Sequence, residues 1–192
     1  MGLLVPVLLG TVRANRQGIK AARFIIGHLQ RRGHQPVLVD PMERPLPLLD
    51  RMFKEFPPGT APQVMQDLAD LYRRADGFVI VSGEYNQSIP PALKNLLDHF
   101  LEEYFWRPST IVSYSAGRFA GVRAAIALRP VLAELGMPSL PTVLTIPEIG
   151  KTLAEDGTPT QPWLDKAASR QLDEFEWYAT ALAAKRAGGT PY

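Results

Sequence analysis

Five short, mainly apolar runs alternate with segments of helical periodicity along this chain, and this alternation restricts the possible fold more than any other feature. The runs are LLVPVLL at 3–9, PVLV at 36–39, GFVIVS at 77–82, STIVSYS at 109–115 and SLPTVLTI at 139–146. Short, nearly continuous apolar runs are typical of strands buried on both faces. Strands that alternate with helices predict a parallel sheet with right-handed crossovers and helices on both sides.

The segments between these runs have apolar residues at helical spacing. The predicted helices cover about 17–32, 62–74, 90–106, 120–135 and 164–182. Gly33 supplies a stop for the first of them, and Pro62 suits the first turn of the second. The proline-rich stretch 41–60 is expected to be an irregular surface loop.

Length and composition indicate one globular domain, expected to span 1–192. Of the 192 residues, 46% are hydrophobic and 21% are charged, which is close to the average for such domains. The 21 Lys and Arg against 19 Asp and Glu leave a net charge of +2, too small to indicate a nucleic-acid or membrane partner. No run is long enough for a membrane span and the first residues lack a signal-peptide pattern, so we expect a cytoplasmic protein.

The chain contains no cysteine, which excludes disulfides, thiolate nucleophiles and iron–sulfur or Cys-zinc sites. Its three histidines, His28, His34 and His99, lack the H-x-x-x-H spacing of a metal site, so we expect no metal. No residue stands out as a general acid or base. Redox chemistry in this protein would therefore need a bound cofactor.

In a parallel sheet of this kind, ligands bind outside the carboxyl ends of the strands, where the strand order reverses. A strand order of 2-1-3-4-5 places the loops after the first, third and fourth strands side by side at that point. These loops contain GTVRANRQGIK at 10–20, GEYNQSIP at 83–90 and SYSAGRFAG at 113–121. We expect the ligand site among them.

The first of these loops has the features of a phosphate site. It combines the hydroxyl of Thr11 with the guanidinium groups of Arg13 and Arg16, and Gln17 and Gly18 lie at the start of the following helix. A helix N-terminus is partly positive, and Arg binds phosphate oxygens bidentately. Neither G-x-x-x-x-G-K-[ST] nor G-x-G-x-x-G is present, so a nucleoside-triphosphate loop and the dinucleotide fingerprint are not expected.

The other two loops suit a flat ligand. Glu84, Tyr85 and Asn86 place a carboxylate, a planar ring and an amide in succession, which is unusual for a mere connector. In the third loop, the glycines Gly117 and Gly121 permit tight turns and a close approach of backbone to a ligand.

These motifs resemble those of the NAD(P)H-dependent FMN reductases of flavodoxin-like fold, which include related quinone, chromate and azo-dye reductases. The resemblance covers nearly the whole chain. It is carried by G-T-x-R at 10–13, G-E-Y-N-x-S-I-P at 83–90, L-K-N-x-x-D at 93–98 and S-x-G-x-x-x-G at 115–121. It implies a flavodoxin-like three-layer sandwich, with a five-stranded parallel sheet of order 2-1-3-4-5.

The resemblance also implies a cofactor, a reaction and a set of site residues. FMN would be the cofactor, NADPH or NADH the cosubstrate, and a quinone, azo compound, metal oxyanion or free flavin the acceptor in a ping-pong mechanism. No protein residue would be catalytic, because the flavin carries the chemistry. The implied FMN-binding residues are Thr11, Arg13, Arg16, Gln17 and Gly18 at the phosphate, Gly83, Glu84, Tyr85 and Asn86 along the isoalloxazine, and Ser115, Gly117 and Arg118 at its other edge.

Two other functions fit the same pattern. One is a flavodoxin-like electron carrier without nicotinamide turnover, and the other is a non-enzymatic module that binds a phosphorylated ligand. The arginines of the first loop disfavour the carrier, because flavodoxins are typically acidic and bind phosphate with Ser/Thr-rich loops. Many members of the family have a proline where this chain has Gly83, which predicts a more flexible loop at the flavin edge.

The apolar stripe of the helix expected over 90–106 predicts self-association. It includes Phe100, Tyr104, Phe105 and Trp106 and is wider than packing on one face of a sheet requires. We therefore expect a homodimer or homotetramer. The alternative is that the 41–60 loop covers the stripe.

Overall fold

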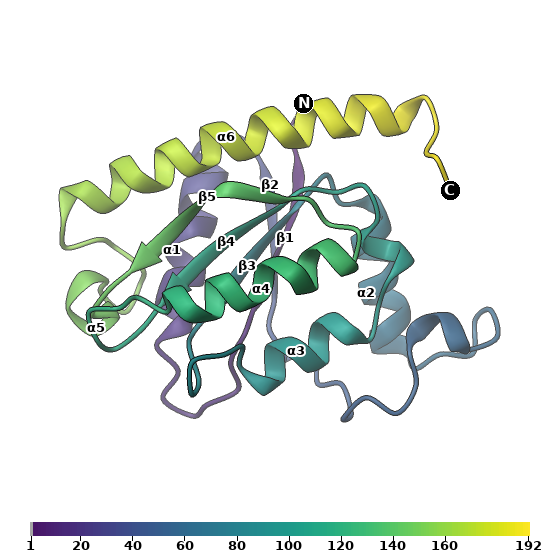
Figure 1. Ribbon diagram of the computed structural model, residues 1–192, viewed down its shortest axis with the longest axis horizontal. Coiled ribbons are helices and arrows are strands. Elements are labelled where there is room, and N and C mark those ends of the chain that lie inside the picture. Colours follow the sequence, from purple (N-terminus) through teal and green to yellow (C-terminus); the bar gives the residue numbers. More distant parts are fainter. Residues whose placement is uncertain (1) are drawn as a thin grey trace.

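The computed structural model describes residues 2–192 and confirms the expected architecture (Figure 1). Within this range the strands form one parallel sheet of order β2-β1-β3-β4-β5. The strands are β1 (Leu4–Leu9), β2 (Gln35–Val39), β3 (Phe78–Ser82), β4 (Ser109–Tyr114) and β5 (Ser139–Ile146). Their bounds lie within one residue of the predicted runs. The central strands β1, β3 and β4 are almost wholly buried between the layers of helices, whereas the edge strands β2 and β5 are buried only in part.

Helices cover both faces of the sheet, as Figure 1 shows. One layer contains α1 (Gly18–Arg31) and α6 (Pro162–Ala187), and the other contains α2 (Gln63–Arg74), α3 (Pro91–Asp98) and α4 (Val122–Glu134). The shorter elements are α5 (Ile149–Thr152) and the 3₁₀ turns η1 (Phe53–Glu55) and η2 (Glu102–Tyr104). None of the helices in residues 2–192 combines the length and apolar content that crossing a bilayer requires.

Alternate residues of each central strand point to opposite helical layers. Val79 and Val81 of β3 pack in the core beneath α1 and α6, whereas Phe78 and Ile80 pack in the core beneath α2, α3 and α4. All four side chains are fully buried. The two-residue period of a strand thus supplies both cores from one continuous apolar run.

The helix expected over 90–106 is shorter than its sequence pattern indicates. The α-helix ends at Asp98, and Phe100 and Tyr104 turn inward, where both are fully buried. Tyr72 of α2 packs against both, with ring centroids 5.0 Å from Phe100 and 5.3 Å from Tyr104, and Phe53 of the 41–60 loop lies 5.9 Å from Phe100. The prediction is therefore wrong beyond Asp98, because burying these rings in the core requires the chain to leave the helical path.

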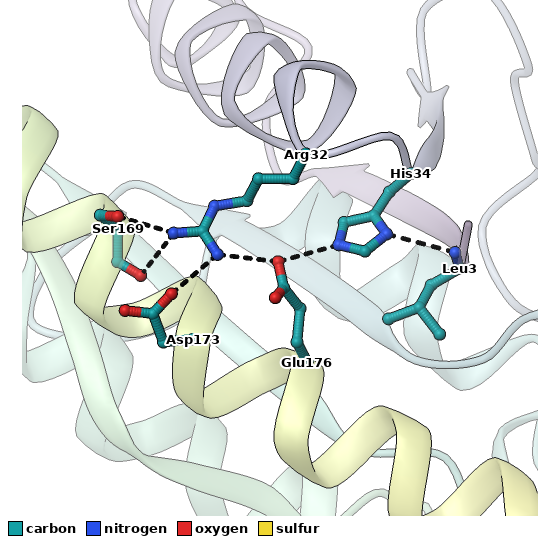
Figure 2. A network of polar contacts seen from close by, with 6 residues as sticks. All are labelled: Leu3, Arg32, His34, Ser169, Asp173 and Glu176. Atoms are coloured by element: carbon teal, nitrogen blue, oxygen red, sulfur yellow. Dashed lines mark hydrogen bonds and ion pairs between the residues drawn. The ribbon is translucent and has the colours of Figure 1, made fainter. Parts of the chain in front are cut away.

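The C-terminal helix is attached to the end of α1 by a group of polar contacts (Figure 2). Arg32 follows α1 directly, and its guanidinium donates to the carboxylates of Asp173 and Glu176 at 2.8 Å each and to the hydroxyl of Ser169 at 2.6 Å. The three acceptors lie on successive turns of α6. One side chain thus joins the end of α1 to three positions of the long helix.

His34 extends these contacts to the first strand. Its Nδ1 accepts the N–H of Leu3 at 3.2 Å, so the ring hydrogen belongs on Nε2, which lies 2.9 Å from Glu176 Oε1 (Figure 2). Glu176 therefore accepts hydrogen bonds from both Arg32 and His34. This carboxylate joins α6 to the chain on both sides of the turn between α1 and β2.

Replacing Glu176 with alanine is expected to lower the free energy of unfolding by about 1–2 kcal/mol, because it leaves two partly buried donors without their shared acceptor. Asp173→Ala is the matched control, since its more exposed carboxylate contacts Arg32 alone, and we expect a loss below about 0.5 kcal/mol. Urea denaturation followed by circular dichroism measures both. Equal losses in the two variants would contradict the joining role of Glu176.

Candidate functional site

The loops after β1, β3 and β4 meet at the carboxyl edge of the sheet. β3 pairs with β1 on one side and with β4 on the other, and the chain runs from β1 out to β2 before returning to β3. The strand order therefore reverses between β1 and β3. This is the position at which open parallel sheets bind ligands.

Tyr114, the last residue of β4, is the contact point of the first two loops. A β-carbon on Gly18 would lie 2.3 Å from the Tyr114 hydroxyl oxygen, and a β-carbon on Gly83 would lie 3.1 Å from the Tyr114 ring. Any larger residue at Gly18 would displace the ring, and one at Gly83 would press against it. Gly83 thus makes room for the Tyr114 ring, in addition to any flexibility that it gives the loop.

Sequence reasoning did not select Tyr114 as a site residue. The ring is 8% exposed, and burial raises the pKa of its hydroxyl well above the usual range, with Tyr85 raising it further. The hydroxyl therefore stays protonated at neutral pH and can donate a hydrogen bond. The available signal was its position, because it lies at the start of the third predicted loop, at a strand end.

In the first loop, the hydroxyl of Thr11 is hydrogen-bonded, whereas the guanidinium of Arg13 is exposed. Thr11 is 2% exposed, and its Oγ1 accepts the N–H of Arg13 at 3.4 Å and lies 3.3 Å from the hydroxyl of Tyr85. Thr11 thus links the first and second loops. The Arg13 side chain is exposed and forms no ion pair within residues 2–192. Its guanidinium is available to an external anion.

Arg16 is committed to a partner in its own chain. Its two terminal nitrogens donate to the two carboxylate oxygens of Asp40, which is 1% exposed and directly follows β2. Asp40 Oδ1 also accepts the N–H of Met42 at 2.9 Å, so the same carboxylate shapes the start of the 41–60 loop. Sequence reasoning missed Asp40, although a lone acidic residue after an apolar strand was a readable signal.

Gln17 and Gly18 lie at the start of α1 as expected. Gln17 is the residue before the helix, and its carbonyl accepts the N–H of Lys20 at 3.0 Å. No acidic residue stands in the first turn of α1. The first N–H groups of a helix have no partner inside the helix, so this end presents free donors and a partial positive charge beside Arg13.

The second loop contains a tight turn. Tyr85 and Ser88 exchange two main-chain hydrogen bonds at 3.1 and 3.0 Å, and the residues between them, Asn86 and Gln87, have φ values of 49° and 67°. Positive φ at both central positions defines the type I′ turn, which favours Asn. The turn uses the N–H groups of its two ends, and those of the exposed Asn86 and Gln87 have no main-chain partner among residues 2–192.

Glu84 reaches across to the helix that follows β4. Its carboxylate accepts the main-chain N–H of Arg123 at 3.1 Å and the guanidinium of the same residue at 3.2 Å. The Glu84 side chain is 13% exposed and the Arg123 side chain 42%, so water reaches this contact mainly from the Arg123 side. A carboxylate at the first turn of a helix is stabilised by the helix dipole. Glu84 therefore joins the second loop to α4.

The third loop is held by the chain after β5. Ser115 donates its main-chain N–H to the carbonyl of Ile146 at 3.2 Å and its hydroxyl to the carbonyl of Gly117 at 2.7 Å, and that carbonyl also accepts the N–H of Glu148 at 3.0 Å. Arg118 is exposed and forms no ion pair within residues 2–192. Gly121, at φ 73°, supplies the left-handed turn before α4.

The structure thus brings most of the expected residues to one edge of the sheet. This edge offers exposed cations at Arg13 and Arg118, free N–H groups at the start of α1, and two exposed N–H groups in a rigid turn. Such donors suit a phosphate at one end and the polar edge of a flat ring at the other. Residues 2–192 contain no cluster of three or more His, Asp or Glu side chains that could hold a metal ion.

Several proteins of known name resemble this chain in sequence. It is 44% identical to an NAD(P)H-dependent FMN reductase of Schizosaccharomyces pombe over 75 residues, which are 38% of this chain and 36% of that protein. It is 36% identical to a quinone reductase of Pseudomonas putida over 84 residues, or 41% and 45% of the two chains. These matches span less than half the length of either relative. An FMN-dependent NADPH-azoreductase of Staphylococcus aureus is 25% identical over 159 residues, or 79% of this chain and 81% of that protein.

Solved structures resemble the fold over nearly the whole chain. The flavoenzyme NAD(P)H:(acceptor) oxidoreductase FerB of Paracoccus denitrificans matches with a TM-score of 0.75 at 19% identity, covering 92% of this chain and 98% of that one. A flavodoxin variant of Pseudomonas aeruginosa matches with a TM-score of 0.53 at 17% identity, covering 88% and 98%. These likenesses show a flavodoxin-like fold. The model of the NADPH-dependent FMN reductase family matches residues 3–151, and the chain therefore belongs to that family.

Proposed function

We propose that this protein binds FMN at the carboxyl edge of its sheet and oxidises NAD(P)H, with a quinone, azo compound, metal oxyanion or free flavin as the acceptor. The observation that carries the proposal is the exposed guanidinium of Arg13 in the loop before α1, which forms no ion pair within residues 2–192 and lies on the same edge of the sheet as the turn from Tyr85 to Ser88. Family membership and the names of the relatives support it.

The phosphate of FMN would bind at the first loop. Arg13 supplies the free positive charge, and Gln17 and Gly18 at the start of α1 supply donors and a partly positive helix end. The hydroxyl of Thr11 points to Tyr85, so Thr11 would close the gap between phosphate and ring. Arg16 would contribute chiefly by holding the loop against Asp40, since both of its terminal nitrogens are already bonded.

The isoalloxazine ring would lie along the second and third loops. Gly83 and Glu84 bring the turn to the strand ends, and Tyr85 and Asn86 would face the ring with a flat surface and with free N–H groups nearby. Ser115, Gly117 and Arg118 would border its other edge. When bound, FMN takes a hydride from a nicotinamide and hands reducing equivalents on, which no side chain of this protein can do. The protein's contribution is to position the ring and exclude side reactions.

The turn from Tyr85 to Ser88 also has an electrostatic consequence. Main-chain donors aimed at the polar edge of a flavin favour a ring that carries more negative charge. Because the turn has both central residues in the left-handed region and two hydrogen bonds closing it, its donors need little rearrangement when the ligand binds. This rigidity favours an enzyme that accepts a hydride.

The second candidate function is a flavodoxin-like electron carrier, which the structural likeness to a flavodoxin favours. The first loop weighs against it, because Arg13 and Arg16 replace the hydroxyl-rich pattern typical of flavodoxins. A binding module for another phosphorylated ligand would use the same loop.

The cytoplasmic location and the single domain over 1–192 stay predictions.

Arg13→Gln is expected to weaken FMN binding about 10- to 100-fold, since it removes a charged hydrogen-bond donor from the phosphate. Riboflavin is the matched control ligand, because it lacks the phosphate but keeps the ring, and its affinity should change less than about twofold. Titration of the flavin-free protein, followed by flavin fluorescence, measures both. Equal losses of affinity for the two ligands would contradict the assignment of Arg13 to the phosphate of FMN.

Steady-state kinetics test the enzyme against the carrier. If nicotinamide and acceptor occupy the same space beside the ring, the first product leaves before the acceptor binds, so NADPH and benzoquinone should give parallel double-reciprocal lines. NADPH added without acceptor and without oxygen should bleach the flavin absorbance in stoichiometric amount. Intersecting lines would require both substrates to bind together. Bleaching by dithionite but by neither NADPH nor NADH would assign the protein to the carriers.

We also propose that the protein self-associates, though through a different surface from the buried rings of 100–104. Val122 and Ile126, four residues apart on one face of α4, are 39% and 64% exposed, and Phe119 in the turn before this helix is 63% exposed. Light scattering at micromolar concentration should give at least twice the mass of one chain, and Ile126→Lys should shift this toward the monomer. A monomeric mass for the unaltered protein would reject the proposal.

A further inference from the structure

A cavity of about 370 Å³ lies between the 41–60 loop and the start of α3. Val12 of the first loop lines it, and so does Pro91, the first residue of α3, which directly follows the second loop. Its volume is within the range of small-molecule pockets, which are mostly apolar with a few polar groups. The residues that line it are Val12, Pro41, Arg44, Pro45, Leu46, Leu48, Pro91, Ala92, Asn95 and Leu96.

The outer wall of the cavity is held in place at two points. Asn95 of α3 donates its side-chain nitrogen to the carbonyl of Pro47 at 2.8 Å, and its side-chain oxygen accepts the N–H of Leu49 at 2.9 Å. At the other end, Asp40 accepts the N–H of Met42 through its side chain and the N–H groups of Glu43 and Arg44 through its carbonyl, at 3.0 and 2.9 Å. These bonds preform the wall, which lowers the entropy cost of binding a ligand.

The lining of the cavity is mainly apolar, with one charged side chain and one amide. Eight of its ten side chains are apolar, and the amide of Asn95 is used on the main chain of the loop. Arg44 is the single charged member, it is half-buried, and it forms no ion pair or side-chain hydrogen bond within residues 2–192. A partly buried guanidinium without a carboxylate partner favours an anionic ligand.

We propose that this cavity binds an aromatic ring system that carries one anionic group, with the ring against the prolines and leucines and the anion on Arg44. The proposal rests on the proposed function in one respect, because it assigns the ligand as an electron acceptor. Sulfonated or carboxylated quinones and azo compounds belong to this class. The cavity thereby selects among the acceptors that the family as a whole could use.

The lining also argues against the adenosine phosphate end of NADPH as the occupant. A purine has several ring nitrogens and an amino group that need hydrogen-bond partners, and the lining offers it only apolar side chains apart from Arg44 and the committed Asn95. Burying those purine groups unpaired is costly. A naphthalene-like ring has no such groups, so the apolar walls favour it.

Calorimetric titration of the purified full chain with naphthalene sulfonate and with neutral naphthol tests the site without requiring turnover. Arg44→Gln should weaken the sulfonate about tenfold and leave naphthol within about twofold, because only the sulfonate contacts the guanidinium. Ala92→Phe, which fills the cavity from α3, should weaken both compounds. The matched control is Arg74→Gln, which removes the same charge at the end of α2 and should change neither affinity.

The outcomes separate the site from the reaction. The proposed site would be overturned if naphthalene sulfonate did not bind, or if it bound Arg44→Gln and the unaltered protein with equal affinity. This conclusion would hold even if Ala92→Phe failed to fold. Adenosine 2′-phosphate that binds more tightly than naphthalene sulfonate, and loses this affinity in Arg44→Gln, would assign the cavity to NADPH instead.

The kinetic comparison completes the test with the FMN-loaded protein. Arg44→Gln should raise the KM for a naphthoquinone sulfonate about tenfold, with kcat and the KM for neutral naphthoquinone unchanged. An unchanged KM for the sulfonate would overturn the assignment to acceptors. If the unaltered protein did not bind FMN, or if NADPH did not bleach the bound flavin, only the proposed function would be contradicted. The calorimetric result depends on neither.

Discussion

The packing of the Tyr114 ring between two loops is the contact on which the candidate site depends. Gly18 at the start of α1 and Gly83 after β3 both leave room for this ring, and neither position has space for a β-carbon at ordinary contact distance. The ring belongs to the core beneath α1 and α6, so it is as rigid as the core itself. The first loop and the second loop are therefore positioned by the same buried side chain.

Charged side chains at this edge fall into two groups with different physical roles. Arg16 with Asp40 and Glu84 with Arg123 are paired inside the chain, and each pair joins a loop to a neighbouring element. Arg13 and Arg44 have no such partner within residues 2–192. Because the charges of the first group are engaged with each other, this group acts on loop geometry. Arg16 with Asp40 is the more buried of its two pairs, with side chains 16% and 1% exposed. The second group is available to ligands.

The 41–60 loop contributes to both the fold and the proposed ligand class. On one side Phe53 covers the rings of the inner core, and on the other the segment 41–48 forms the wall of the cavity above α3. Asn95 holds this segment to α3 through two hydrogen bonds. A change in the length or sequence of this loop would therefore alter ligand selection, and its effect on stability would depend on whether Phe53 stays in place.

The sequence by itself determined the parallel sheet and the three loops at its carboxyl edge, because continuous apolar runs and helical spacing are local patterns that predict strands and helices. The resemblance of its motifs to those of the FMN reductases supplied the strand order 2-1-3-4-5. The sequence could not locate the end of α3, because that end depends on the inward turn of Phe100 and Tyr104. These rings pack against Tyr72 and Phe53, which come from distant parts of the chain. Nor could the sequence separate Arg13 from Arg16, which look alike in it. Only the tertiary structure decided that Asp40 engages Arg16, while Arg13 has no ion-pair partner in the described part of the chain, because ion pairing depends on distances between residues far apart in the sequence.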